Sequence, residues 1–179
     1  MSGRNEQRAY LSLGGNLGEP AKAMAAALRM LDADRQTRVV AVSSLYRTPP
    51  WGKLDQPDFL NVAAEIATRH TPRELLELCL DAERSLKRVR AERWGPRIVD
   101  IDVLTFDDIS LHEPGLELPH PRMLDRAFVL VPLSEIAPDF VMAGKTIAEH
   151  AATVDRAGIT RQDGEPDWWR SATEPPARS

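Results

Sequence analysis

The order in which strand-like and helix-like segments follow one another constrains the fold of this chain more than any other feature of its sequence. Strand composition occurs at four places: residues 9–13, 38–48, 59–68 and the stretch that ends at 106. Apolar residues recur at helical spacing in two segments, residues 21–33 and 71–89. The resulting β-α-β-β-α-β order predicts an α+β fold of the ferredoxin-like type, in which two helices cover one face of an antiparallel four-stranded sheet.

The second helical segment is the best defined of these elements, because its start carries three separate signals. Thr71 is a preferred N-cap residue, Pro72 suits the first helical position, and Glu74 stands where a capping box needs a carboxylate. The first helical segment follows the turn "GGNLGEP" and has Pro20 in its first turn. We therefore expect both helices to begin at these residues.

The residues beyond Asp107 are expected to add C-terminal elements to this fold. The stretch 111–124 is typical of a proline-rich loop, residues 126–138 fit either a helix or a strand, and residues 145–154 fit a short helix. The ends of the chain are polar, so we expect a disordered N-terminus over residues 1–8, a single domain over 9–160 and a flexible tail over 161–179.

Composition narrows the class of protein. The 179 residues are 42% apolar and 28% charged with a net charge of −4, which favours neither a nucleic-acid nor a membrane partner. The apolar runs are too short to cross a bilayer, and the polar start "MSGRNEQR" lacks the apolar core of a signal peptide, so a cytoplasmic protein is expected. The single cysteine, Cys79, excludes an internal disulfide.

Two carboxylates interrupt the last of the four predicted strands. Alternate residues of a strand share a face, so Val99, Ile101 and Val103 form an apolar face. Asp100 and Asp102 share the other face, roughly 7 Å apart along the strand. Oxygen ligands of this kind suit Mg²⁺, which often binds one or two carboxylates together with phosphate oxygens. The alternative is an antiparallel sheet whose second face is simply exposed to water.

A cluster of cationic residues precedes these carboxylates. Its members are Arg84, Lys87, Arg88, Arg90, Arg93 and Arg97. A helix C-terminus favours cations, which accounts for the cluster up to Arg88, but the residues from Arg90 onward are predicted to lie past the helix. A guanidinium group can donate two parallel hydrogen bonds to two phosphate oxygens, and a metal ion neutralises phosphate charge. Carboxylates beside arginines therefore indicate a polyphosphate substrate.

A glutamate falls on the apolar stripe of the second helical segment. Glu83 shares this stripe with Leu76, Cys79 and Leu86, where a carboxylate is costly unless it meets a partner. The side chain either has such a partner or extends to the edge of the stripe. The sequence contains no Walker-type loop, no G-x-G-x-x-G, no Ser-His-Asp set and no zinc-type cluster, so side chains and metal ions would have to hold any nucleotide.

Five stretches of the chain together resemble one known family. They are "YRTPPWG", "QPDFLN", "RVRAERWGPRIVDIDVL", "LPHPRM" and "PLSEIAPD". With these motifs the chain is similar, over about residues 9–140, to the 6-hydroxymethyl-7,8-dihydropterin pyrophosphokinases of folate biosynthesis. The R-W-G-P-R-x-x-D-x-D block is the most specific of the five.

The resemblance implies an enzyme that moves the β,γ-pyrophosphoryl group of ATP onto the hydroxymethyl group of the pterin and releases AMP. It implies two Mg²⁺ ions held by Asp100 and Asp102, with Arg88, Arg90 and Arg97 beside the triphosphate and active in catalysis. Five further residues match family positions at the nucleotide or the closed site: Glu83, Trp94, Val103, His120 and Arg126.

The resemblance also implies a pterin site. The ring lies between the aromatic side chains of Phe59 and Phe128, and its edge is bound by Thr48, Pro49, Trp51 and Asn61. A flat, amide-bearing ring needs aromatic faces and a polar rim, so these residue types fit the ligand. The expected partners are ATP and the pterin as small-molecule substrates, and the protein is expected to be a monomer.

The chain departs from the family pattern at several positions, and two other functions stay open. Gly15 replaces a usual serine in "GGN", Lys87 replaces a usual glycine, and the arginine-rich loop is one residue shorter. A small-ligand regulatory module on the same fold would not need the carboxylates beside the arginines. Another Mg²⁺-dependent phospho- or nucleotidyltransferase would not need the "PPWG" and "DFLN" motifs.

Overall fold

An antiparallel sheet forms the centre of the molecule. The computed structural model describes residues 5–50, 55–91 and 99–170, with residues 88–91 described by their backbone only. The three longest-paired strands of the sheet are β4 (Phe59–Thr68), β1 (Gln7–Gly15) and β5 (Asp100–Phe106), which lie in that order, so that β5 forms one edge of the sheet. The other side of β4 pairs with β2 (Thr37–Val42) and β3 (Tyr46–Thr48), and β10 (Thr160–Arg161) adds to β3.

The strand predicted over residues 38–48 is in fact two strands, β2 and β3, that pair with different parts of β4. The break lies at Ser43 and Ser44, where the Ser43 N–H still donates to the Ala63 carbonyl oxygen of β4 (2.9 Å). The Ser43 hydroxyl accepts a bond from the Ala63 N–H (2.9 Å), and the Ser44 N–H donates to the carboxylate of Glu135 (3.1 Å). A side-chain acceptor thus replaces the strand partner at the break, which β-branched composition alone does not reveal.

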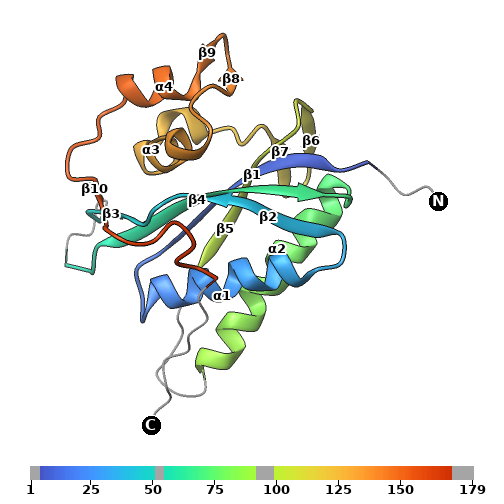
Figure 1. Cartoon of the computed structure of the whole chain (residues 1–179), viewed down its shortest axis with the longest axis horizontal. Coiled ribbons are helices and arrows are strands. Elements are labelled where there is room, and N and C mark those ends of the chain that lie inside the picture. The colour runs from blue at the N-terminus through green and yellow to red at the C-terminus, as the bar shows by residue number, and fades with distance from the viewer. Residues whose placement is uncertain (1–4, 51–54, 92–98, 171–179) are drawn as a thin grey trace.

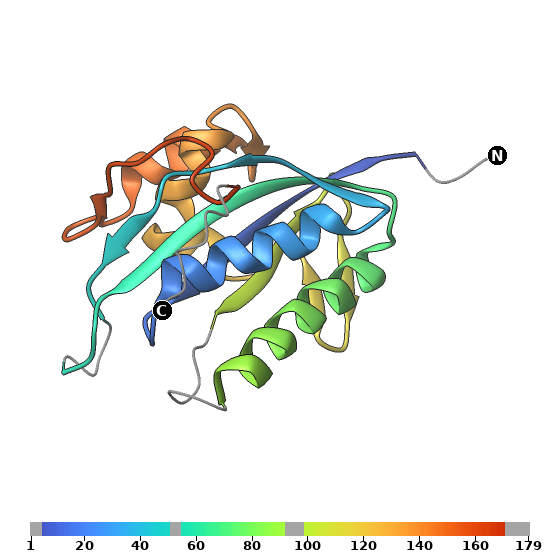
Figure 2. The same ribbon diagram turned by 60° about the horizontal axis from the view of Figure 1, so that its bottom comes forward.

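Two helices cover one face of the sheet, as predicted (Figure 2). They are α1 (Pro20–Ala33) and α2 (Pro72–Ala91). The predicted capping box of α2 is confirmed, since the Glu74 N–H donates to Thr71 Oγ1 (3.1 Å) and the Thr71 N–H donates to Glu74 Oε1 (2.9 Å). The helix is longer than predicted and extends to Ala91, so Arg90 lies on its last turn and not beyond it.

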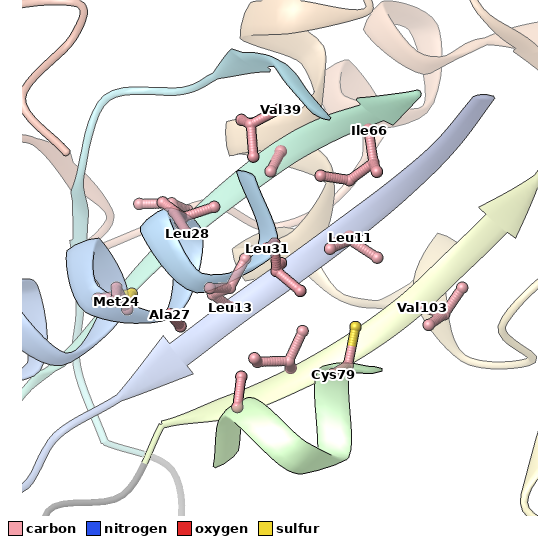
Figure 3. Packing of buried hydrophobic residues seen from close by; sticks show 14 of the residues in the cluster. Leu11, Leu13, Met24, Ala27, Leu28, Leu31, Val39, Ile66, Cys79 and Val103 are labelled. Carbon is pink, nitrogen blue, oxygen red and sulfur yellow. The ribbon is translucent and has the colours of Figure 1, made fainter. Parts of the chain in front are cut away.

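The main hydrophobic core lies between these helices and the sheet. Leu28 and Leu31 of α1 and Cys79 of α2 pack against Leu11 and Leu13 of β1 (Figure 3). All five side chains are fully buried. Burying a leucine side chain contributes about 1.5–3 kcal/mol, so this layer accounts for much of the stability of the sheet.

The opposite face of the sheet is partly covered by α3 (Ala127–Ile136) and α4 (Ile147–Thr153) (Figure 1). Residues 126–138, which fitted either a helix or a strand, are thus helical, and the short helix predicted within 145–154 is confirmed. Leu130 and Leu133 of α3 pack with Leu104 of β5 in a second, smaller cluster. A short hairpin whose strands have two residues each, β8 (Val141–Met142) and β9 (Lys145–Thr146), precedes α4.

The stretch 111–124 was predicted as a loop, and this is wrong. It forms a hairpin of β6 (Leu111–Glu113) and β7 (Leu116–Leu118), followed by the short 3-10 helix η1 (Met123–Asp125). Gly115 makes the turn with φ of 76°. Leu116 and Leu118 are buried while Glu117 is exposed, so the alternation of a strand was present in the sequence.

The terminal segments are more ordered than predicted. β1 begins at Gln7, inside the segment expected to be disordered. Residues 161–170 were expected to be flexible, but Trp169 is only 3% exposed and belongs to the main core. Two large indole rings in a polar tail were the signal for this packing. Among the helices of the described residues, none has the length and apolar character needed to cross a membrane.

Candidate active site

The two carboxylates of β5 lie on the face of the sheet away from α1 and α2. Val99, Ile101 and Val103 are 2–5% exposed and point into the main core, which confirms the predicted alternation. Asp100 pairs across the sheet with Gly14 of β1, and Asp102 pairs with Ser12. The sheet register therefore places two aspartates and two very small residues side by side.

Gly14 is small for a steric reason. A Cβ atom at Gly14 would lie 2.6 Å from the Oδ1 atom of Asn61, its partner on β4. Asn61 in turn donates from Nδ2 to the hydroxyl oxygen of Thr48 on β3 (3.0 Å), and both side chains are buried. The missing side chain at Gly14 thus leaves room for an asparagine whose orientation is set by Thr48.

A cavity of about 400 Å³ opens over these residues. Eight residues predicted for the site line it: Thr48, Pro49, Phe59, Asn61, Asp100, Asp102, Arg126 and Phe128. The two phenylalanines come from the start of β4 and the start of α3. The Arg126 guanidinium lies over the Phe128 ring, 5.5 Å from its centroid, which is within cation–π range. The cavity therefore combines aromatic surfaces, a buried amide, carboxylates and guanidinium groups.

Three lining residues were not predicted. Ser12 and Gly14 follow from the register of β1 against β5, which the sequence does not fix. Arg122 lies in "HPRM", between β7 and η1, and its N–H donates to His120 Nδ1 (3.1 Å). A cation two residues after the predicted His120 was a signal that could have pointed to it.

A second cavity, of about 420 Å³, adjoins the first. It is formed by Leu76 of α2, by Ile101, Asp102 and Val103 of β5, and by the hairpin and loop residues His112–Leu116, Glu117, His120 and Pro121. It contains Val103 and His120 from the predicted nucleotide site. Burial lowers the pKa of His120, which favours the neutral form of its imidazole. Asp102 lines both cavities and thus stands where they meet.

Glu83 of α2 has the partner that its position required. Its Oε2 atom accepts a hydrogen bond of 2.6 Å from the backbone N–H of Ile101, on the outer edge strand of the sheet. Burial raises the pKa of Glu83, and the charges of Asp100 and Asp102 raise it further, against the opposing effect of the Ile101 bond. Glu83 therefore connects α2 to the strand that carries the two aspartates.

Burial and the charge of Asp102 raise the pKa of two carboxyl groups of this region, Glu83 and Asp100. Desolvation and the charge of Asp102 raise the pKa of Asp100, while the Lys87 ammonium opposes this shift. A cation bound beside the aspartates would relieve the repulsion. Within the described residues no group of three or more histidine, cysteine or acidic side chains could hold a metal ion unaided. Two carboxylates suit an ion whose other ligands are water or phosphate oxygens, as Mg²⁺ prefers.

Several predicted residues cannot be placed. Trp51, Trp94 and Arg97 lie outside the described residues. Arg88 and Arg90 lie on the last turns of α2, which ends at Ala91, and their side chains are likewise outside the description.

Solved structures that resemble this chain include the wild-type HPPK-DHPS of Plasmodium falciparum with pteroate. That structure matches with a TM-score of 0.66 at 17% identity, over 85% of this chain and 43% of the other. At this identity the likeness concerns the fold. It agrees with a mixed structure of helices on an antiparallel sheet.

Sequence relatives are closer. A protein of Methylorubrum extorquens named 2-amino-4-hydroxy-6-hydroxymethyldihydropteridine pyrophosphokinase is 53% identical over 86% of this chain and 98% of its own length. One of Pseudomonas aeruginosa with the same name is 43% identical over 88% of this chain and 98% of its own length. The profile of one family matches residues 10–138. The chain therefore belongs to the 7,8-dihydro-6-hydroxymethylpterin-pyrophosphokinase family.

Proposed function

We propose that this protein transfers the pyrophosphoryl group of ATP to the hydroxymethyl group of 6-hydroxymethyl-7,8-dihydropterin, a step of folate biosynthesis, and releases AMP. The observation that carries the proposal, beyond family membership, is that Asp102 lines two adjoining cavities of different chemistry. One has aromatic walls and a buried amide, and the other has an imidazole and a glycine-containing turn. A transfer between two substrates needs two such sites that meet at the reacting atoms.

The pterin occupies the cavity of about 400 Å³. Phe59 and Phe128 supply apolar surfaces for the faces of the ring. The Asn61 amide, held by its bond to Thr48, offers hydrogen bonds to the ring edge, where a polar group in a buried site discriminates strongly between ligands. Pro49 completes the wall, and Trp51 is assigned to the same site from the family resemblance alone.

ATP occupies the second cavity, with its triphosphate directed toward Asp102. Val103 and His120 line this cavity, and Arg122 and Arg126 stand on the side of the first cavity, where the phosphates meet the pterin hydroxyl. Guanidinium groups stabilise the charge that shifts over phosphoryl oxygens during transfer. From the resemblance we assign the same task to Arg88, Arg90 and Arg97, and a nucleotide contact to Trp94. Glu83 acts through the backbone of Ile101.

Asp100 and Asp102 are the residues that would hold magnesium, and we propose two ions. The bound ions would supply charge neutralisation for the triphosphate. The chain's own residues orient the two substrates so that the pterin hydroxyl faces the β-phosphorus opposite the AMP oxygen. We also propose that the strand order, with α1 and α2 on one face, is the ferredoxin-like arrangement with added C-terminal elements, and that the protein acts as a monomer.

Product analysis tests the function. The purified protein is mixed with ATP, Mg²⁺ and 6-hydroxymethyl-7,8-dihydropterin, and nucleotides and pterins are separated. We expect AMP and the pterin diphosphate, in equal amounts and only when all components are present. ADP in place of AMP would indicate transfer of a single phosphoryl group. Binding of ATP without any product would favour a regulatory module.

A further inference from the structure

A segment beyond the family match packs against the strand that forms one wall of the first cavity. We call this segment, residues 155–170, the C-terminal strap. Its strand β10 pairs with β3, Thr160 opposite Arg47 and Arg161 opposite Tyr46 (Figure 1). The Gln162 N–H also donates to the Leu45 carbonyl oxygen (2.8 Å). The outer edge of β3 is therefore held by the strap.

The far end of the strap is fixed to the main body. Trp169 is 3% exposed and lies in the main core, and its carbonyl oxygen accepts a bond of 2.9 Å from the Arg29 guanidinium on α1. The neighbouring Trp168 donates from Nε1 to the Ser43 carbonyl oxygen (3.1 Å), at the break before β3. An element anchored at one end and paired along its length has little freedom to move away from β3.

The near end of the strap touches the cavity wall directly. Gly158 has a φ of 83°, and a Cβ atom there would lie 2.9 Å from Cγ and 3.2 Å from Cδ of Pro49. Real Cβ atoms almost never come this close to another heavy atom. A proline ring can change only its pucker, so a side chain at Gly158 must shift either the Pro49 ring or the loop that carries Gly158. Pro49 lines the first cavity beside Thr48.

We propose that the C-terminal strap is a positioning element for the pterin site, and that Gly158 sets the distance at which Pro49 stands in the cavity wall. The inference rests on the proposed function, because it names a determinant of the same site. Thr48 is the acceptor that orients Asn61, so a shift of Pro49 reaches the polar rim through the adjoining residue. The strap thus acts on pterin binding and leaves the ATP cavity, which it does not line, unchanged.

Two glycines of this chain provide a matched test. Gly144, in the turn between β8 and β9, has a φ of 81°, and a Cβ atom there would meet nothing within 4 Å. Gly158→Ala and Gly144→Ala therefore add the same methyl group with the same backbone strain, and only the first presses on Pro49. The measurements are KM for the pterin, KM for ATP and kcat by AMP release, and the melting temperature of each variant.

For Gly158→Ala we expect KM for the pterin to rise about three- to tenfold, less than the effect of a methyl-sized misfit inside a pocket, because the added methyl group acts on the ligand only through Pro49. KM for ATP and kcat should stay within about twofold of the parent. Gly144→Ala should lower the melting temperature to a similar extent without changing either KM. Equal pterin KM values in the two variants would overturn the inference, and so would a parallel rise of both KM values in Gly158→Ala. In either case, AMP release by the parent protein would still support the proposed function. A parent that releases no AMP with the pterin would overturn both.

A double-mutant cycle adds a test of the route. If Gly158 acts through the Pro49 ring, Gly158→Ala should raise KM for the pterin much less in a Pro49→Ala background than in the parent, and additive effects would contradict this route. Should Gly158→Ala fail to fold, Trp168→Phe takes its place. It keeps an aromatic ring and removes the bond to Ser43, and we expect about a twofold rise in pterin KM alone; no such rise, or an equal rise in KM for ATP, would overturn the inference.

Discussion

Two neighbouring rows of residues run across β4, β1 and β5 and have opposite character. In one row Val62, Leu13 and Ile101 stand side by side, and all three are buried in the main core. One residue further along, the row of Asn61, Gly14 and Asp100 borders the first cavity. Because side chains alternate across a sheet, stability and chemistry are assigned to opposite faces of the same three strands. A change on one face should therefore leave the property of the other intact.

The strongest test of this separation is Asp102→Ala. Asp102 lines both cavities, and removing its carboxylate should lower turnover by about a thousandfold or more, which corresponds to about 4 kcal/mol of transition-state stabilisation. The melting temperature should change little. AMP release and thermal unfolding check this, with Asp108→Ala, an exposed aspartate beyond β5, as the control. Near-normal turnover of Asp102→Ala would contradict the assigned role.

The reverse result is expected for Leu13→Ala, on the core face of β1 next to Gly14. Leu13 is fully buried and lines neither cavity, and truncating such a side chain costs about 2–5 kcal/mol of unfolding free energy. Both KM values of the folded protein should stay within about twofold. Denaturant unfolding and steady-state kinetics measure the two effects, and Val141→Ala, at an exposed site, is the control. Loss of activity without loss of stability would break the comparison.

Arg122 sharpens the description of the cavity face. Arg122→Ala should reduce kcat/KM for ATP by about tenfold, or about 1.4 kcal/mol, because it removes a cation beside the proposed phosphate path. Arg84→Ala serves as the control, since Arg84 is an exposed arginine of α2 that pairs with Asp81 and lines neither cavity. Equal effects of the two substitutions would show that Arg122 acts only through the overall charge of the protein surface, which would contradict its proposed place beside the phosphates.

The smallest expected effect is a change in stability caused by the repulsion between the carboxylates of the site. Asp100→Asn removes one of the charges that repel each other and should stabilise the metal-free protein at neutral pH by less than about 1 kcal/mol, because the side chain is partly solvated. The pKa of Asp100 is raised in the folded state. Ionised Asp100 therefore destabilises the fold at pH values above the folded-state pKa, and this penalty is absent at pH values below the unfolded-state pKa. The gain over the parent should therefore shrink as the solution is acidified through the carboxylate range. A gain that is constant with pH would exclude this cause.

Much of the fold could be predicted from local patterns. The start of α2 follows from Thr71, Pro72 and Glu74, and the two faces of β5 follow from alternation, because in both cases the residues involved are neighbours in sequence. The hairpin of residues 111–118 was missed because the prolines in this stretch are typical of a loop and outweighed the alternation of apolar and polar residues. The packing of Trp169 was missed because it depends on a contact 140 residues away, with Arg29.

The site was predictable to a similar extent and for similar reasons. Carboxylates next to arginines indicate phosphate chemistry from the local sequence alone, and the family motifs point to the aromatic and amide residues. Ser12 and Gly14 are residue types that occur commonly in turns and strands. They enter the site only through the register of β1 against β5 and the steric demand of Asn61, neither of which a single sequence specifies.

The bond between Glu83 and Ile101 has a consequence for self-association. β5 is an edge strand, and unpaired N–H groups on such an edge invite pairing with the strand of another molecule. Glu83 occupies the donor of Ile101 and adds a negative charge beside the edge, where a second copy would present the same charge. Glu83, which interrupts the apolar stripe of α2, therefore also disfavours edge-to-edge pairing of β5 with a second molecule.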